Sequence, residues 1–349
     1  MASIKKLKNG TFQATISCGK NAEGKQIRKY ITKDTQKECK SAAREFETEF
    51  EEGLIVNYQN KKFALWIDEW LELNKSRLKP STYVSYKIYA GHFKTFFNNL
   101  KVSQITEIHI KRYINERLKI NSACTVKKHL FVLSRMLQDI LKNKNPCRDV
   151  QHPKKIKYSP HIITGDEFEK IKECVKGTDM EPIVLMSAWC GMRRGEICAL
   201  KWDDIDWNNN TLRVDETVCV TESGYKLGTP KSQNGMRTVI APKQLMALLE
   251  AIKKKDGLRR EKVFTKSPGA VTSSFHWIAY ERIGLPIRFH DLRHYHANWL
   301  RKNGVPDIYA AERLGHDVQT LKNIYQHIDS GERFNIEKAM IKLIETPGF

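Results

Sequence analysis

Six polar residues in the second half of the chain have the side-chain types and local contexts expected around one phosphate. They are Arg193, Lys231, His290, Arg293, His316 and Tyr325. An arginine fork binds two phosphate oxygens at once and keeps its charge, and the histidines and the lysine add donors where negative charge develops. A tyrosine supplies an oxygen nucleophile once nearby cations favour its phenolate form. The pattern predicts phosphoryl transfer on a nucleic-acid backbone, with no metal ion and no other cofactor.

Two of these positions have a competitor close by in the sequence. Lys226 lies in the same predicted hairpin region as Lys231, so either lysine could approach the phosphate. Tyr309 is the nearest alternative to Tyr325, but Tyr325 follows His316 by nine residues. That spacing favours Tyr325 as the nucleophile.

The charge of the chain points to a polyanionic partner. The 349 residues carry a formal net charge of +20 at pH 7, and phosphate contacts supply most sequence-independent affinity for DNA. A generally basic surface or a ribosome-associated protein is the competing interpretation. The eight cysteines show no metal-ligand spacing, and no apolar run approaches the roughly 18 residues of a membrane span. We therefore expect a cytoplasmic protein without a membrane partner, associated with the nucleoid when it binds DNA.

Residues 1–52 have the pattern of a small α+β domain. Short alternating segments predict strands, and Thr35 to Glu52 predicts a helix rich in acidic residues. The predicted sheet carries the candidate DNA-binding residues Lys5, Lys6, Lys8, Arg28 and Lys29. A small sheet can enter the major groove as a ribbon. The alternative is a structural β-β-β-α cap with solvated lysines.

Residues 63–145 predict an all-α domain. An apolar stripe with helical spacing begins at Phe63, and its aromatic rings favour a core over base stacking. Further helices are expected at about 107–118 and 123–141. Lys87, Lys127 and Lys128 are candidate DNA contacts on the outer faces.

Residues 160–349 predict a mixed, mainly α domain with β-hairpins. Thr164 begins a capping box, and the helix around 183–189 should end at Gly191. We expect the next helix to carry Glu196 and to extend through Trp202. Strands are predicted at 211–214 and 218–220, followed by a hairpin from Gly228 to Ala241.

These motifs resemble those of the tyrosine recombinases, the phage-integrase family. The run CGMRRGEICALKWDDID at 190–206 resembles box I, and HDLRH at 290–294 resembles box II. Leu-Gly-His at 314–316 and Tyr325 complete the pattern at the family spacing, and Pro-Lys-Ser at 230–232 resembles the segment with the hairpin lysine. The resemblance covers the whole chain, with 1–52 similar to an arm-type DNA-binding domain, 63–145 to a core-binding domain and 160–349 to a catalytic domain.

The resemblance implies a role for each of the six residues. Tyr325 would attack the scissile phosphate and leave a 3′-phosphotyrosine and a free 5′-hydroxyl. Lys231 would protonate the leaving oxygen, His290 would assist proton transfer, and His316 would donate to a non-bridging oxygen. The two arginines would bind the non-bridging oxygens. Glu196 is expected to support the arginine site.

The resulting hypothesis is a site-specific DNA recombinase, the integrase of a phage or of an integrative element. Its partners would be double-stranded DNA attachment sites of core and arm type. Four copies would exchange strands through a Holliday junction, together with an excisionase and a host DNA-bending protein. The alternatives are a nicking-closing enzyme similar to type IB topoisomerases and a catalytically idle architectural DNA-binding protein.

The C-terminal residues 334–344 predict a helix with an apolar stripe. The stripe consists of Ile336, Ala339, Met340, Leu343 and Ile344. Such a stripe needs a groove to bury it. It can pack on its own catalytic domain, whereas the family resemblance suggests a neighbouring protomer.

Overall fold

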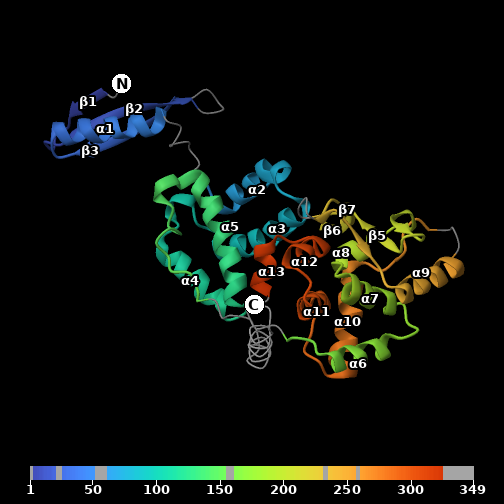
Figure 1. Ribbon diagram of the computed structural model, residues 1–349. Helices are drawn as coiled ribbons and strands as arrows, with labels where there is room; N and C mark the ends of the chain where they lie inside the picture. The colour runs from blue at the N-terminus through green and yellow to red at the C-terminus, as the bar shows by residue number, and fades with distance from the viewer. Residues whose placement is uncertain are drawn as a thin grey trace, which may run out of the picture. The chain divides into compact units, whose positions relative to one another are not determined.

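The computed structural model describes residues 3–20, 26–51, 61–154, 161–230, 235–256 and 260–324. The chain divides into two compact units, Met1–Lys157 and Tyr158–Phe349 (Figure 1). Within the described ranges, no helix combines the length and apolar character needed to cross a membrane.

The first part of the chain is a three-stranded antiparallel sheet with one helix. The strands β1 (Ser3–Lys6), β2 (Phe12–Lys20) and β3 (Gln26–Lys33) pair in the order β1-β2-β3, and α1 (Gln36–Glu51) packs on β2 and β3. Ala14 and Ile16 of the sheet form a small buried core with Cys39 and Ala43 of the helix. The predicted α+β architecture is therefore confirmed for these residues.

The strand register separates the predicted basic residues onto two faces. Lys6 pairs with Phe12 and Lys29 pairs with Ile16, so both lie on the face that α1 covers. Lys5 pairs with Gln13, and Arg28 pairs with Ser17, which places Lys5 and Arg28 on the open face. All four side chains are exposed, as is Lys8 in the turn between β1 and β2. The positive surface of the sheet is therefore not a single face.

Residues 61–154 form the predicted all-α part. It contains α2 (Phe63–Asn74), α3 (Pro80–Phe96), α4 (Glu107–Leu118) and α5 (Ala123–Leu141). The aromatic residues lie in the core, since Trp66 donates from Nε1 to the Met136 carbonyl at 2.9 Å and Trp70 stacks on Tyr86 at a centroid distance of 6.1 Å. The prediction of core packing for these rings is confirmed. Lys87 and Lys128 are exposed and Lys127 is half-buried.

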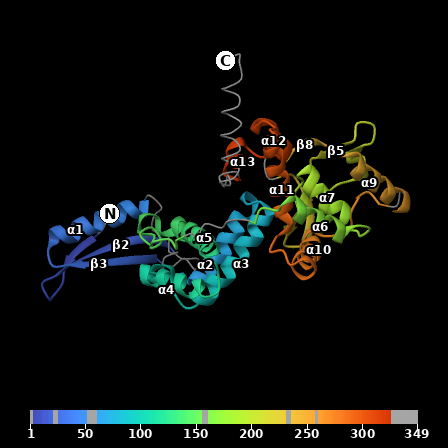
Figure 2. The ribbon, with the colours of Figure 1, turned by 60° about the horizontal axis from the view of Figure 1, so that its bottom comes forward.

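The second unit is built around a buried helix. Helix α7 (Glu181–Cys190) packs against α6 (Gly165–Val175), α9 (Lys243–Asp256) and α11 (Phe289–Lys302) (Figure 2). Pro182 to Ala188 are all buried, because the segment is apolar on every side. The unit also contains α10 (Pro268–His276), which continues into a π-helix (Trp277–Ile283), then α12 (Asp307–Leu314) and α13 (Val318–Ile324). The capping box at Thr164 is present, with Glu167 donating its backbone N–H to the Thr164 hydroxyl at 3.2 Å.

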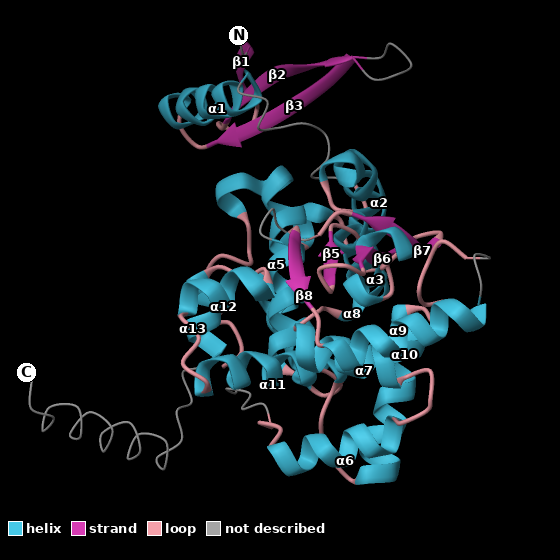
Figure 3. Ribbon diagram, turned by 45° about the vertical axis from the view of Figure 1, so that its right-hand side comes forward, coloured by secondary structure: helices cyan, strands magenta, loops and turns pink. Residues whose placement is uncertain are grey.

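Two small sheets follow a short helix in this unit (Figure 3). Helix α8 (Arg194–Ile197) leads to β4 (Ile205–Asp206) and β5 (Thr211–Val214), and β5 pairs with β8 (Arg237–Ile240). Strands β6 (Thr217–Thr221) and β7 (Gly224–Gly228) form a separate hairpin.

Two details of the sequence prediction for this region are wrong. The helix that was expected to extend through Trp202 ends at Ile197, because Leu200 and Trp202 instead exchange backbone hydrogen bonds with the segment around Lys262. Within the described part of this segment, the predicted hairpin from Gly228 to Ala241 is not found, since β8 pairs with β5 and β7 pairs with β6. Both differences arise from contacts between segments that are distant in the sequence.

Candidate active site

A glycine turn carries the chain from α7 toward the first of the predicted arginines. Gly191 has a φ of 65°, in the left-handed region, and the N–H of Met192 donates to the Met186 carbonyl at 3.3 Å. A Cβ atom on Gly191 would lie 2.6 Å from Leu314 Cδ2 and 2.8 Å from His296 Cδ2. Both the backbone conformation and the close packing therefore require glycine here.

Arg193 is held by two separate segments. Its backbone N–H donates to Glu196 Oε2 at 2.9 Å and its Nη1 donates to Glu196 Oε1 at 2.7 Å. Its Nη2 donates to the carbonyl of Gly315 at 2.9 Å. The Arg193 side chain remains 28% exposed, so it is oriented by the protein and still accessible to a ligand.

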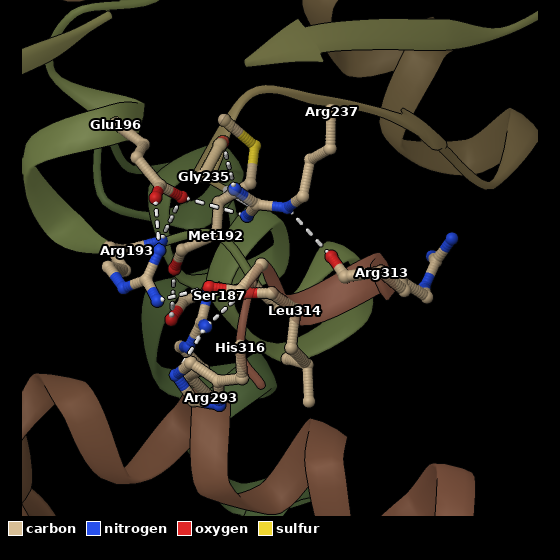
Figure 4. Close-up of polar contacts among 12 residues, drawn as sticks. Ser187, Met192, Arg193, Glu196, Gly235, Arg237, Arg293, Arg313, Leu314 and His316 are labelled. Carbon is tan, nitrogen blue, oxygen red and sulfur yellow. Dashed lines mark hydrogen bonds and ion pairs between the residues drawn. The ribbon is translucent and has the colours of Figure 1, made fainter. Parts of the chain in front are cut away.

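Arg293 projects from α11 into the same region (Figure 4). It is buried, and its guanidinium donates to the carbonyls of Gly191 and Leu314 and, from Nη2, to His316 Nε2 at 2.9 Å. Its Nε has no hydrogen-bond partner among the described residues. Burial and the charge of Arg193 lower the pKa of Arg293. An anion bound here would therefore relieve an electrostatically unfavourable arrangement.

The contact with Arg293 defines the tautomer of His316. Because a guanidinium only donates, Nε2 of His316 accepts and the ring proton lies on Nδ1. Nδ1 is buried and has no partner in the described part of the chain. Desolvation and the charges of Arg293 and Arg193 lower the pKa of His316 to about 3. His316 is thus a neutral residue whose buried Nδ1–H has no acceptor among the described residues.

His290 lies one turn before Arg293, at the N-terminal end of α11. Its ring meets that of His294 edge to face at a centroid distance of 4.8 Å. Although His290 keeps solvent-accessible surface, desolvation by the surrounding protein, followed by the charges of His294 and Arg293, lowers its pKa to about 4. At neutral pH the ring is therefore uncharged, so one of its nitrogens can accept a hydrogen bond and the other can donate one.

Glu196 lies buried between two arginines. One oxygen accepts from Arg193 and the other accepts from Arg237 Nη2 at 2.8 Å. Burial would raise the pKa of Glu196, but the hydrogen bond and charge of Arg237, together with the charge of Arg193, outweigh it and lower the pKa. These contacts agree with the expected supporting role of Glu196.

Other residues from the sequence prediction fall into two groups. Lys231, Tyr325 and the apolar stripe of 334–344 lie outside the described residues. Within the described part, Lys226 is exposed on β7, and Tyr309 is 69% exposed on α12, where it lines the same groove as His316.

Sequence reasoning missed two buried or half-buried arginines near this site. The sequence pattern assigned no role to Arg237 or to Arg313. Arg313 donates from Nε to His296 Nε2 at 3.1 Å and from Nη2 to the Trp189 carbonyl at 3.1 Å. His296 in turn donates from Nδ1 to the Ala188 carbonyl at 3.0 Å, so both of its ring nitrogens form hydrogen bonds within the protein. No local sequence pattern distinguishes these arginines from surface charges.

Comparison with protein families gives two matches. The model described as "Phage integrase family" matches residues 162–332, and the model described as "Phage integrase, N-terminal SAM-like domain" matches residues 62–118.

Individual proteins match over most of the chain. A tyrosine recombinase XerC-like protein of Caldanaerobacter subterraneus subsp. tengcongensis is 29% identical, covering 96% of this chain and 97% of that protein. The ICEBs1 integrase of Bacillus subtilis is 26% identical, covering 93% and 95%. Both span nearly the full length of this chain.

Solved structures share the fold at low sequence identity. The Tn1549 transposon integrase in complex with transposon right end DNA has a TM-score of 0.67 at 16% identity, covering 80% of this chain and 99% of that one. A lambda integrase tetramer bound to a Holliday junction has a TM-score of 0.58 at 19% identity, covering 90% and 95%.

Proposed function

Because this chain belongs to the phage integrase family of tyrosine recombinases, we propose that its cluster of Arg193, Arg293 and His316 binds the scissile phosphate during site-specific DNA recombination. The observation that carries the proposal is the 2.9 Å contact between Arg293 Nη2 and His316 Nε2, next to an oriented and accessible Arg193. Donors placed in advance around developing charge stabilise a transition state more than a ground state.

In the proposed reaction Tyr325 attacks the phosphate and forms a 3′-phosphotyrosine, and the 5′-oxygen leaves. Lys231 protonates that oxygen, and the neutral His290 assists proton transfer. The exchanged 5′-hydroxyl then attacks the phosphotyrosine, which releases Tyr325 and rejoins the strand. The bond energy is conserved in the covalent intermediate, so the chemistry needs no external energy source.

The proposed partners are two kinds of double-stranded DNA attachment site. The helical domain at 63–145 would bind core-type DNA together with the catalytic domain that contains the site. The exposed basic residues of the N-terminal sheet would bind arm-type DNA. A homotetramer on a Holliday junction is supported by the solved lambda integrase assembly with the same fold. An excisionase and a host DNA-bending protein would set the direction of the reaction. The match to the ICEBs1 integrase supports an integrative element or a phage as the source of the DNA.

Covalent capture on a nicked suicide duplex tests the chemistry. The full chain should become attached to the DNA, and Tyr325→Phe should abolish the adduct while DNA binding stays nearly intact. Tyr309→Phe is the matched control, since Tyr309 lines the groove beside His316, and it should react normally. An adduct that persists in Tyr325→Phe and disappears in Tyr309→Phe would reverse the assignment.

A second assay separates recombination from the alternatives. Two duplexes that carry attachment sites should yield recombinant products only if synapsis occurs. Relaxation of supercoiled DNA without recombinants would indicate an enzyme similar to type IB topoisomerases. Binding without any adduct would indicate an idle architectural protein.

A further inference from the structure

Arg237, the first residue of β8, is a buried arginine beside the proposed phosphate site, and all three of its guanidinium nitrogens donate hydrogen bonds. Its side chain is 4% exposed. Nη2 donates to Glu196 Oε2 at 2.8 Å, Nε donates to the Arg313 carbonyl at 2.7 Å, and Nη1 donates to the Gly235 carbonyl at 3.0 Å (Figure 4). One side chain therefore connects α8, the end of α12 and the segment before β8.

The bond to the Arg313 carbonyl belongs to a regular arrangement at the C-terminus of α12. Three successive carbonyls there each accept from a different arginine. The Arg313 carbonyl binds Arg237, the Leu314 carbonyl binds Arg293, and the Gly315 carbonyl binds Arg193. The last carbonyls of a helix lack partners within the helix and favour cations. His316 follows directly, so the three arginines jointly fix the backbone that carries it.

The bond to Glu196 connects Arg237 to Arg193 as well. Glu196 uses one oxygen for the Arg237 guanidinium and the other for the Arg193 guanidinium. Without Arg237, the buried carboxylate would lose a charged partner and could turn further toward Arg193. The guanidinium that meets the phosphate would then be oriented differently.

We propose that Arg237 is a positioning residue for DNA cleavage, which holds Arg193 through Glu196 and holds His316 through the Arg313 carbonyl. The inference rests on the proposed function, because it assigns Arg193 and His316 to the phosphate. Arg237 itself is buried with three of its donors engaged, so it acts through these neighbours. A displacement of about 1 Å in such a site lowers the rate by about 100-fold.

The test compares Arg237→Gln and Arg237→Lys in the full chain, with Arg194→Gln as control. Arg194 is exposed on α8, so this control removes one positive charge near the site without breaking the Glu196 contact. Single-turnover cleavage of a nicked suicide duplex is measured against DNA concentration. In Arg237→Gln we expect the maximal rate to fall about 10- to 100-fold, with the half-saturating DNA concentration within about twofold of wild type. Arg237→Lys keeps the charge and should recover part of the rate.

The pH dependence of the cleavage rate is a second measurement, which would not change if Arg237 only stabilised the fold. The charged groups that face Glu196 are Arg193, Arg237 and, from α11, Arg293. Arg237 contributes the largest of the interactions that lower the pKa of Glu196, against the desolvation that raises it. Arg237→Gln should therefore raise this pKa, and cleavage should begin to fail at a higher pH as the solution is acidified. Arg237→Lys and Arg194→Gln should shift the pH at which cleavage fails on acidification, the acid limb of the profile, less or not at all.

The outcomes are distinguishable. If the wild-type chain forms no adduct, the proposed function fails. If wild type reacts and both Arg237 variants match it in rate and acid limb, the positioning role is overturned. A loss confined to DNA affinity, or an equal loss in Arg194→Gln, would also overturn it. Should thermal unfolding show that Arg237→Gln is not folded, the rate and acid limb of Arg237→Lys decide the question by the same criteria.

Discussion

The Nη2 atom of Arg293 lies 2.9 Å from Nε2 of His316, so a buried arginine determines which nitrogen of the histidine carries the proton. The two residues come from α11 and from the turn after α12. Arg293 also binds the carbonyls of Gly191 and Leu314, which places the box II arginine at the junction of three segments. A change at Arg293 would therefore alter the local charge, the positions of these segments and the tautomer of His316 together.

Arg293→Lys tests whether cleavage depends on the positive charge at position 293 or on the planar shape of the guanidinium. A lysine keeps the positive charge, but its single ammonium cannot reproduce the planar fork that meets two carbonyls and His316. We expect single-turnover cleavage to fall roughly 100- to 1,000-fold and the free energy of unfolding to fall by about 1–3 kcal/mol. Arg301→Lys on the same helix, where Arg301 bonds Asn298, is the control and should cleave normally. Cleavage by Arg293→Lys within a few-fold of wild type would contradict the assignment.

Gly195→Ala should disturb the site through the β6–β7 hairpin. A Cβ atom on Gly195 would lie 2.5 Å from Thr217 Oγ1 and 3.0 Å from the Val218 carbonyl. Either β6 or α8 must move, and α8 begins directly after Arg193. We expect a loss of about 1–3 kcal/mol in the free energy of unfolding, together with slower cleavage.

The matched control for that substitution is Gly165→Ala. Gly165 begins α6, and a Cβ atom there would have no neighbour within 4 Å. Denaturant unfolding of both variants should show a loss only for Gly195→Ala. Equal stability of the two variants would indicate that the hairpin adapts without strain.

The sequence predicted local features of the fold better than long-range ones. The helices at 107–118 and 123–141 were predicted with their observed bounds, because helical periodicity and capping depend on residues that are close together in the sequence. The partner of β8 and the early end of α8 depend on pairing with β5 and with the segment around Lys262. Such pairing leaves no periodic signal within either segment.

The same distinction applies to the candidate site. Arg193, Arg293 and His316 were found from motifs and do lie together, linked through hydrogen bonds. Arg237 escaped notice because its role is set by Glu196 and the Arg313 carbonyl, which are distant in the sequence. Its burial could be learned only from the fold.

His296→Gln should reduce the pH dependence of stability. Desolvation and the charge of Arg313 lower the pKa of His296 to about 3 from its usual value of 6.5. As the pH falls below about 6.5 the unfolded chain takes up a proton that the folded chain does not, so stability is lost progressively toward pH 3. Glutamine keeps one donor for the Ala188 carbonyl and one acceptor for Arg313, but it does not titrate.

Urea unfolding between pH 7.5 and 5 measures this effect. The slope of the unfolding free energy against pH should be smaller in His296→Gln by up to about 1.4 kcal/mol per pH unit, the value for one proton. The other histidines are unchanged, so the difference between the two proteins reports His296. Parallel curves would show that His296 does not stay neutral in the folded chain.

The open face of the N-terminal sheet should carry the arm-site contacts. Lys5 and Arg28 lie on that face, whereas Lys6 and Lys29 lie on the face that α1 covers. The double variants Lys5→Ala/Arg28→Ala and Lys6→Ala/Lys29→Ala remove the same charge. If the sheet enters a groove, the first should lose arm-site affinity at least about tenfold more than the second, since phosphate attraction alone depends mainly on the number of charges. Equal losses in a salt titration would indicate only nonspecific attraction.

A groove of about 610 Å³ on the second unit exposes several large apolar side chains. Met236, Ile240, Ile308 and Tyr309 line it and are 56%, 66%, 73% and 69% exposed. Large apolar side chains gathered at a surface indicate a binding site. The predicted apolar stripe of 334–344, which lies outside the described residues, has matching character. Arg237 and His316 also line the groove, so a helix bound there would adjoin the proposed phosphate site.

Deletion of residues 333–349 removes the predicted helix, and Ile308→Asp places a charge in the groove. Both changes should therefore have the same effect on tetramer formation. If the segment binds a neighbouring protomer, each change should leave the melting temperature of the monomer nearly unchanged and weaken tetramer formation on DNA by at least tenfold, about 1.4 kcal/mol. Native gels and light scattering measure assembly, and a two-duplex assay measures paired strand exchange. A lower melting temperature in the isolated monomer would show instead that the segment packs on its own unit. Normal assembly and recombination by both proteins would rule out the groove as its binding site.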